Sequence, residues 1–164
     1  MKLVVTDANI VIDLVAGGLL EEMFRLPGWE FCVPDVLYEE ELADHHGLLL
    51  TGLGLKIETL PADAVEYVAG LRQRYRGPST NDLFALALAR SRGGVLLSGD
   101  GPLRKAAEAE GVEIHGTLWL GELLFEAGLV TAKRMTDAYE AMRGDGSRLP
   151  WDRIRDQLRR WQTP

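Results

Sequence analysis

The fold of this chain is decided by the stretch Leu3-Val4-Val5-Thr6-Asp7-Ala8-Asn9-Ile10-Val11-Ile12. A short β-rich apolar run ends at Asp7, and a helical pattern begins almost immediately after it. This order predicts a buried strand that leads directly into a helix. Because ligands of open α/β sheets bind beyond the carboxyl ends of the strands, Asp7 is predicted to lie where such folds place their chemistry.

Outward from this stretch, strand and helix patterns alternate along the chain. Further strands are predicted at Glu30 to Val33, Leu53 to Leu60 as an edge strand, Val95 to Leu97 and Val112 to Ile114. Helices are predicted at Asn9 to Val15, Leu19 to Leu26, from Pro34 to His45-His46-Gly47, from Pro61, at Leu83 to Ala89, from Pro102, and at Thr117 to Ala127, Thr131 to Met142 and Trp151 to Trp161. The alternation predicts an α/β fold with three layers, in which helices cover both faces of a central parallel sheet.

Composition limits the class of protein. The 164 residues, 46% of them hydrophobic, suit one domain with a substantial core. A net charge of −7 argues against a basic surface that holds nucleic acid by counterion release, so a nucleic-acid enzyme of this charge would need cations. Cys32 is the only cysteine, which excludes an intramolecular disulfide and a cysteine zinc cluster. With neither a signal-peptide core nor a membrane-length apolar run, we expect a soluble cytoplasmic protein without a membrane partner.

Acidic residues recur at the boundaries of the predicted elements. Asp7 and Asp100 each follow a predicted buried strand, Asp82 lies at the mouth of a buried helix, and three glutamates, Glu39 to Glu41, lie within the helix that Pro34 opens. Crowded carboxylates repel one another unless a cation lies between them, and oxygen ligands without a nearby His or Cys suit Mg²⁺ or Mn²⁺. Such an ion activates water and orients a phosphodiester, so the pattern predicts phosphoester hydrolysis. Each aspartate could also cap a helix, and the two roles are compatible.

Four short segments resemble the PIN-domain family, metal-dependent ribonucleases that include the toxins of VapBC-type toxin–antitoxin pairs. The segments occur in the family's order and spacing. They are Val4-Val5-Thr6-Asp7-Ala8-Asn9, Val33-Pro34-Asp35-Val36-Leu37-Tyr38-Glu39-Glu40, Asn81-Asp82-Leu83-Phe84-Ala85-Leu86-Ala87-Leu88-Ala89 and Leu96-Leu97-Ser98-Gly99-Asp100.

The resemblance implies a residue-by-residue assignment. Asp7, Glu40, Asp82 and Asp100 would be the catalytic acids that bind Mg²⁺ or Mn²⁺, with Asn9 and Ser98 as polar support. Glu40 is chosen because the family's acid usually falls six residues after the position of Pro34, and Glu41 remains the alternative. The resemblance also implies an RNA substrate and a small antitoxin as partner. A PIN-like core would span residues 1 to about 115, and residues from about 116 to 164 resemble the helical tail of some prokaryotic PIN proteins, all in one domain.

Two basic stretches carry further hypotheses. Arg72, Arg74 and Arg76 precede Asp82 closely enough to contact RNA phosphates, although a solvated helix face is the plainer interpretation. On the last helix, Arg153, Arg155, Arg159 and Arg160 lie away from an apolar seam, which we expect to pack on its own domain, with a partner protein or a second subunit of a homodimer as the alternative. The seam consists of Trp151, Ile154, Leu158 and Trp161.

Two alternative functions fit parts of the same pattern. A haloacid-dehalogenase-type phosphatase would use Asp7 as a covalent nucleophile, but that family expects a second aspartate where Asn9 stands. A PIN-like binding module without catalysis would not need acids at all four positions.

Overall fold

The computed structural model describes residues 1–162. Its centre is a sheet of five parallel strands in the order β3-β2-β1-β4-β5. These strands are β1 (Lys2–Thr6), β2 (Trp29–Pro34), β3 (Lys56–Glu58), β4 (Val95–Leu97) and β5 (Ile114–His115). The predicted α/β class with a central parallel sheet is therefore confirmed.

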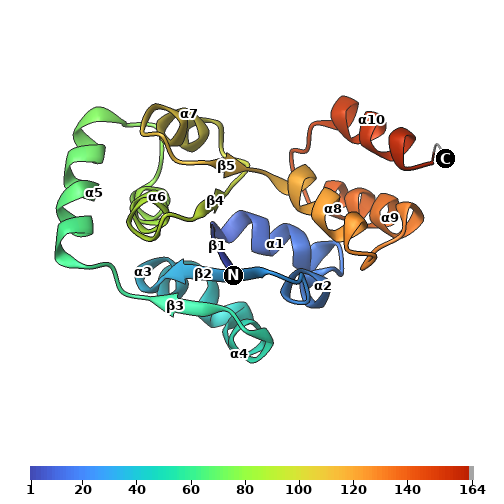
Figure 1. The fold of residues 1–164 in the computed structure, drawn as a ribbon, viewed down its shortest axis with the longest axis horizontal. Coiled ribbons are helices and arrows are strands. Elements are labelled where there is room, and N and C mark those ends of the chain that lie inside the picture. The colour runs from blue at the N-terminus through green and yellow to red at the C-terminus, as the bar shows by residue number, and fades with distance from the viewer. Residues whose placement is uncertain (163–164) are drawn as a thin grey trace.

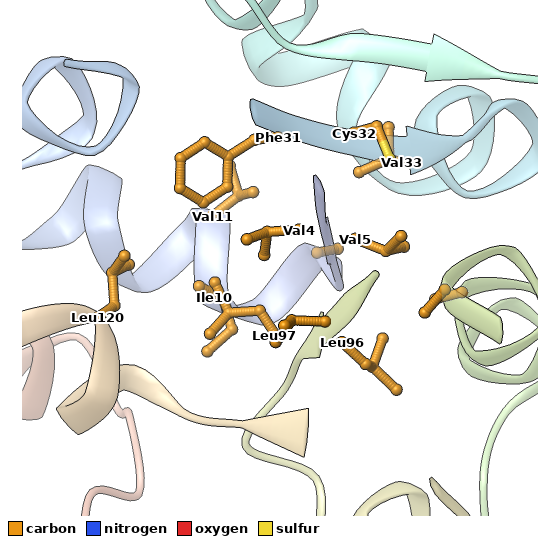
Figure 2. Close-up of a cluster of buried hydrophobic side chains, with 14 of the residues drawn as sticks. Val4, Val5, Ile10, Val11, Phe31, Cys32, Val33, Leu96, Leu97 and Leu120 are labelled. Carbon is orange, nitrogen blue, oxygen red and sulfur yellow. The ribbon is translucent and has the colours of Figure 1, made fainter. Parts of the chain in front are cut away.

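The strand β1 is the middle of the sheet because its residues can be buried on both faces. Val4 and Val5 are both fully buried and point to opposite faces of the sheet (Figure 2). Val4 is aligned with Phe31 of β2 on one edge and with Val95 of β4 on the other. An apolar run buried on both faces is typical of a parallel strand.

Helices form the outer layers. On one side lie α1 (Ala8–Ala16), α2 (Leu20–Phe24), α8 (Thr117–Glu126) and α9 (Ala132–Gly144), and on the other lie α5 (Ala62–Arg74) and α6 (Thr80–Arg92) (Figure 1). The helix α6 packs on β1, β2 and β4, as its buried Leu83, Leu86 and Ala87 require. The helix α7 (Gly101–Ala109) connects β4 to β5, and α10 (Trp151–Gln162) packs on α9.

The helix predicted from Pro34 is longer than expected. It begins as α3 (Asp35–Leu37), passes through a π-helical turn, η1 (Tyr38–Leu42), and continues as α4 (Ala43–Leu53). The predicted end at His45-His46-Gly47 is wrong. Gly47 serves packing rather than termination, because a Cβ there would lie 2.5 Å from the Tyr38 hydroxyl, whereas Gly54, with φ +117°, ends the helix.

Strand boundaries differ from the predicted ones at the two edges of the sheet. The edge position of β3 is confirmed, but it has only the residues Lys56–Glu58 of the predicted Leu53 to Leu60. The strand β5 covers Ile114–His115, one residue beyond the predicted end. Edge strands have a single partner, so fewer hydrogen bonds define their ends.

The last helix packs on its own chain, as the apolar seam predicted. Ile154 is buried, and Gln157 accepts a hydrogen bond from the buried Tyr139 hydroxyl (2.6 Å) while its Nε2 donates to the Leu118 carbonyl (2.9 Å). Trp161 Nε1 donates to Glu122 Oε1 (3.1 Å). The tail is thus fastened to α8 and α9 by hydrogen bonds as well as by apolar contacts. Among residues 1–162, no helix is long and apolar enough to cross a membrane.

Candidate metal-binding site

Asp7 joins the end of β1 to the start of α1. It is the N-cap of α1, and its Oδ1 accepts a hydrogen bond from the Ile10 amide at 2.9 Å. Its own amide donates to the Leu97 carbonyl of β4 at 3.0 Å, and only 2% of the residue is exposed. The capping role is therefore confirmed, and the carboxylate is fixed at the carboxyl edge of the sheet.

Ser98 connects Asp7 with Asp100. The Ser98 hydroxyl donates to Asp7 Oδ2 and accepts a hydrogen bond from the Asp100 amide (3.1 Å). Asp100 in turn is the N-cap of α7, where its Oδ2 accepts from the Leu103 amide at 2.9 Å. Because β1 and β4 are neighbours in the sheet, their carboxyl ends bring two acids together that are far apart in the sequence.

Asp82 reaches the same edge from the start of α6. It forms a capping box with Ser79, in which each side chain accepts a hydrogen bond from the other residue's amide at 3.1 Å. Arg72 fixes the preceding loop, since its Nη2 donates to the Pro78 carbonyl (2.8 Å) and to Thr80 Oγ1 (3.3 Å). The box uses Asp82 Oδ2 and leaves Oδ1 available to a ligand.

The pKa values of Asp7 and Asp82 are both raised, in part by the charges of neighbouring acids. Burial is the largest cause that raises the pKa of Asp7 to about 7, with smaller contributions from the charges of Asp82 and Asp13, whereas the hydrogen bonds from Ser98 and Ile10 lower it. Burial also raises the pKa of Asp82, and the charge of Asp100 adds to that increase. A nearby cation would relieve this repulsion and favour the ionised forms.

The glutamates approach the site through one amide side chain. Asn81 Nδ2 donates to Glu40 Oε2 at 2.8 Å and to Glu41 Oε2 at 3.1 Å. Both glutamates lie in the π-helical turn and are exposed. A π-turn contains an extra residue, which changes the direction of the side chains around it, and such turns are frequent at functional sites. The structure thus brings both Glu40 and Glu41 to Asn81, a residue to which the sequence pattern gave no role in the site.

Asn9 and Asp13 lie beside these acids. Together with Asp100 they line a cavity of about 360 Å³. Asp13 is half-buried. Burial raises the pKa of Asp13, a hydrogen bond with Ser147 lowers it, and the charge of Asp145 raises it again. Its helical spacing from Asn9 was the signal in the sequence that could have identified Asp13.

The three arginines before Asp82 differ in their contacts. Arg72 is occupied by the loop carbonyls, and Arg74 forms an ion pair with Glu110 (2.9 Å). Arg76 is exposed. Contact of these residues with RNA phosphates stays a prediction.

The arrangement of the carboxylates decides whether a divalent metal fits. Within residues 1–162, no three His, Cys, Asp or Glu side chains are placed as a ready-made metal cage. Mg²⁺, however, commonly keeps several waters and binds through one or two carboxylates. The three aspartates fit an ion that is held partly through water. Asp7 and Asp100 are connected through Ser98, and the Oδ1 atom of Asp82 is available.

Comparison with known proteins gives the same fold. The model of a family described as a PIN domain, DUF3368, matches residues 3–163. The structure PAE2754 of Pyrobaculum aerophilum is similar with a TM-score of 0.53 and 16% identity, over 79% of this chain and 98% of that one. A PilT N-terminus domain protein of Sulfolobus solfataricus P2 is similar with a TM-score of 0.45 and 14% identity, over 76% of this chain and 92% of that one. No curated protein matches the sequence.

Proposed function

Because the chain belongs to the PIN-domain family, whose members are generally nucleases, we propose that it is a Mg²⁺- or Mn²⁺-dependent ribonuclease that hydrolyses RNA phosphodiester bonds. One observation carries the proposal. Three acids from separate parts of the sequence, Asp7, Asp82 and Asp100, meet at the carboxyl edge of the sheet, where the charge of Asp82 raises the pKa of Asp7 and the charge of Asp100 raises the pKa of Asp82. Family membership leaves the phosphatase alternative without support.

The chain's own residues have distinct roles in this proposal. Asp7 and Asp100 would hold the cation from the ends of β1 and β4, and the Ser98 hydroxyl connects the two residues by hydrogen bonds. Asp82 Oδ1 would accept a hydrogen bond or a proton from a water on the α6 side. Asn81 keeps Glu40 and Glu41 directed towards the start of α6, where either would add a fourth carboxylate to the three aspartates. When bound, the ion lowers the pKa of a water and stabilises the leaving oxygen.

RNA cleavage by the purified protein tests the proposal directly. We expect cleavage with Mn²⁺ or Mg²⁺ and none with chelator, and strongly reduced cleavage for Asp100→Asn. Asp137→Asn is the matched control, because Asp137 is an exposed residue of α9 and pairs with Lys133 (3.2 Å). If no RNA is cleaved under any metal condition, or if Asp100→Asn retains full activity, the proposal is wrong.

A toxin role is the narrower form of this proposal, and the family resemblance supports it. The expected partner is a small antitoxin that covers the acids with an Arg or Lys. Expression of the protein alone should then stop cell growth, and Asp100→Asn should abolish that effect. If the wild type and the Asp100→Asn variant both stop growth, or if neither does, the protein is not a toxin that acts by cleaving RNA.

A further inference from the structure

A groove leads away from the acids towards α8 and α10. Two cavities of about 360 Å³ and about 520 Å³ share the lining residues Asp13, Gly99, Ser147 and Arg148. The first reaches Asp100, and the second continues past the start of α8 to the connection before α10. We use the name arginine groove for the surface formed by Arg104, His115, Trp119, Arg148 and Arg153.

The arginine groove is distinguished by guanidinium groups that form no ion pair with a carboxylate of the described residues. Within residues 1–162, neither Arg104 nor Arg148 nor Arg153 forms an ion pair with a carboxylate. On the same helix as Arg153, by contrast, Arg155 is paired with Asp152. In a protein of net charge −7, three such arginines along one groove favour an anionic ligand, and guanidinium groups match phosphates well.

Aromatic rings lie beside these arginines. His115 stacks on Trp119 with ring centroids 4.4 Å apart and an angle of 6° between the planes. Trp119 is itself held edge-on against Trp29 at 5.2 Å. The His115 side chain is 32% exposed and lines the groove, so one aromatic ring is available next to positive charge. Rings that stack bases, combined with arginines that follow the backbone, are typical of surfaces that bind single strands.

We propose that the arginine groove binds single-stranded RNA on one side of the bond to be cut. Arg148 and Arg153 contact phosphates, and an unpaired base stacks on the His115–Trp119 pair. Arg104 connects the groove to the acids, because it lies one helical turn beyond Asp100 and its amide donates to the Asp100 carbonyl at 3.0 Å. A duplex fits poorly, since its bases already stack on one another. This inference rests on the proposed ribonuclease function.

The phosphate contacts are tested by RNA binding in chelator, where cleavage does not interfere. The probe is a fluorescent single-stranded oligouridine, and its dissociation constant is measured over a range of salt concentrations. The double variant Arg148→Ala/Arg153→Ala should bind more weakly, with a salt slope smaller by about 1.4, or about 0.7 for each phosphate that an arginine no longer neutralises. Arg155→Ala is the matched control, because Arg155 is paired with Asp152, and it should bind as the wild type does.

The base contact needs a separate probe. An abasic oligomer of the same length carries the same phosphates without bases. His115→Ala should weaken oligouridine binding about tenfold, within the range for removal of one stacked base, and leave abasic binding unchanged. His115→Phe keeps an aromatic ring and should restore binding. Glu113→Gln controls for the hydrogen bond between Glu113 and His115 (2.9 Å).

The outcomes separate this inference from the proposed function. If the wild type cleaves RNA but the arginine double variant binds with unchanged affinity and salt slope, the arginine groove is not the RNA path, although the ribonuclease function stands. Tighter binding of duplex than of single strands also overturns the inference. If the wild type neither binds nor cleaves any RNA, both proposals fall.

Discussion

The two halves of the acidic site are built in different ways. On the sheet side, Asp7 is buried, caps a helix and is joined to Asp100 through Ser98. On the helix side, Glu40 and Glu41 are exposed and reach the site through the amide of Asn81. The sheet half is therefore held in place by caps and by Ser98, and we expect the exposed helix half to adjust its side chains when a ligand binds.

The largest effect is expected on the sheet side. Asp7→Asn and Asp100→Asn should each reduce cleavage by roughly 100- to 1,000-fold, comparable to the loss of one group that stabilises charge in a transition state. The fold should survive, because asparagine is also a good N-cap. Cleavage rates and far-UV circular dichroism check both parts. Unaltered cleavage in both variants would show that the sheet half is not the catalytic half.

The second effect concerns stability and pH in the absence of metal. The pKa of Asp7 is raised from 3.8 to about 7 in the folded protein, so the folded state holds its proton more tightly than the unfolded chain does. Its contribution to the free energy of unfolding is therefore present at low pH and is lost as pH rises from about 4 to above 7. The loss is about 4 kcal/mol, at 1.36 kcal/mol per unit of pKa.

Chemical denaturation of metal-free protein at a series of pH values measures this effect. The curve for the wild type should fall relative to that for Asp7→Asn across this window, and added Mn²⁺ should raise the wild-type curve above pH 7. Parallel curves for the two proteins would mean that Asp7 ionises in the folded state as easily as in water.

A smaller effect is expected at the connection between the two sheet acids. Ser98→Ala removes the hydroxyl that donates to Asp7 and accepts from the Asp100 amide. We expect a loss of roughly 10- to 100-fold in activity or metal affinity, as for other groups that orient metal ligands. Ser91→Ala, on the exposed surface of α6, is the control. If the Ser98→Ala variant is fully active, the backbone positions the two acids without help from the Ser98 hydroxyl.

The smallest effect should be on the helix side. Glu40→Gln should reduce cleavage more than Glu39→Gln, but by less than about tenfold, the lower limit for orienting groups, because exposed Glu41 shares the same Asn81 amide. Asn81→Ala should have a loss similar to that of Glu40→Gln, since both glutamates lose their common donor. The losses are measured as initial rates. Equal losses for Glu39→Gln and Glu40→Gln would mean that the hydrogen bond from Asn81 to Glu40 does not matter for cleavage.

The sequence predicted the parts of the site that depend on neighbouring residues. Asp7, Asp82 and Asp100 were expected as helix caps as well as candidate ligands, and all three cap helices. Cap contacts lie within three residues along the chain, so local sequence defines them. Long-range partners were missed. Asn81 bonds to glutamates 40 and 41 residues away, and its role depends on a π-turn that no local pattern signals.

The sequence by itself determined the strands, most of the helices and the acids at their ends, because apolar periodicity and capping are local properties. Tertiary structure decided which acids meet. Ser98 lies 91 residues from Asp7, and the two touch only because β4 pairs with β1 in the centre of the sheet. It also decided which charges are paired, since Arg155 has its acid on the same helix, whereas Arg148 and Arg153 lie in a groove and form no ion pair within residues 1–162. Pairing and burial depend on the packing of distant segments, which neighbouring residues do not specify.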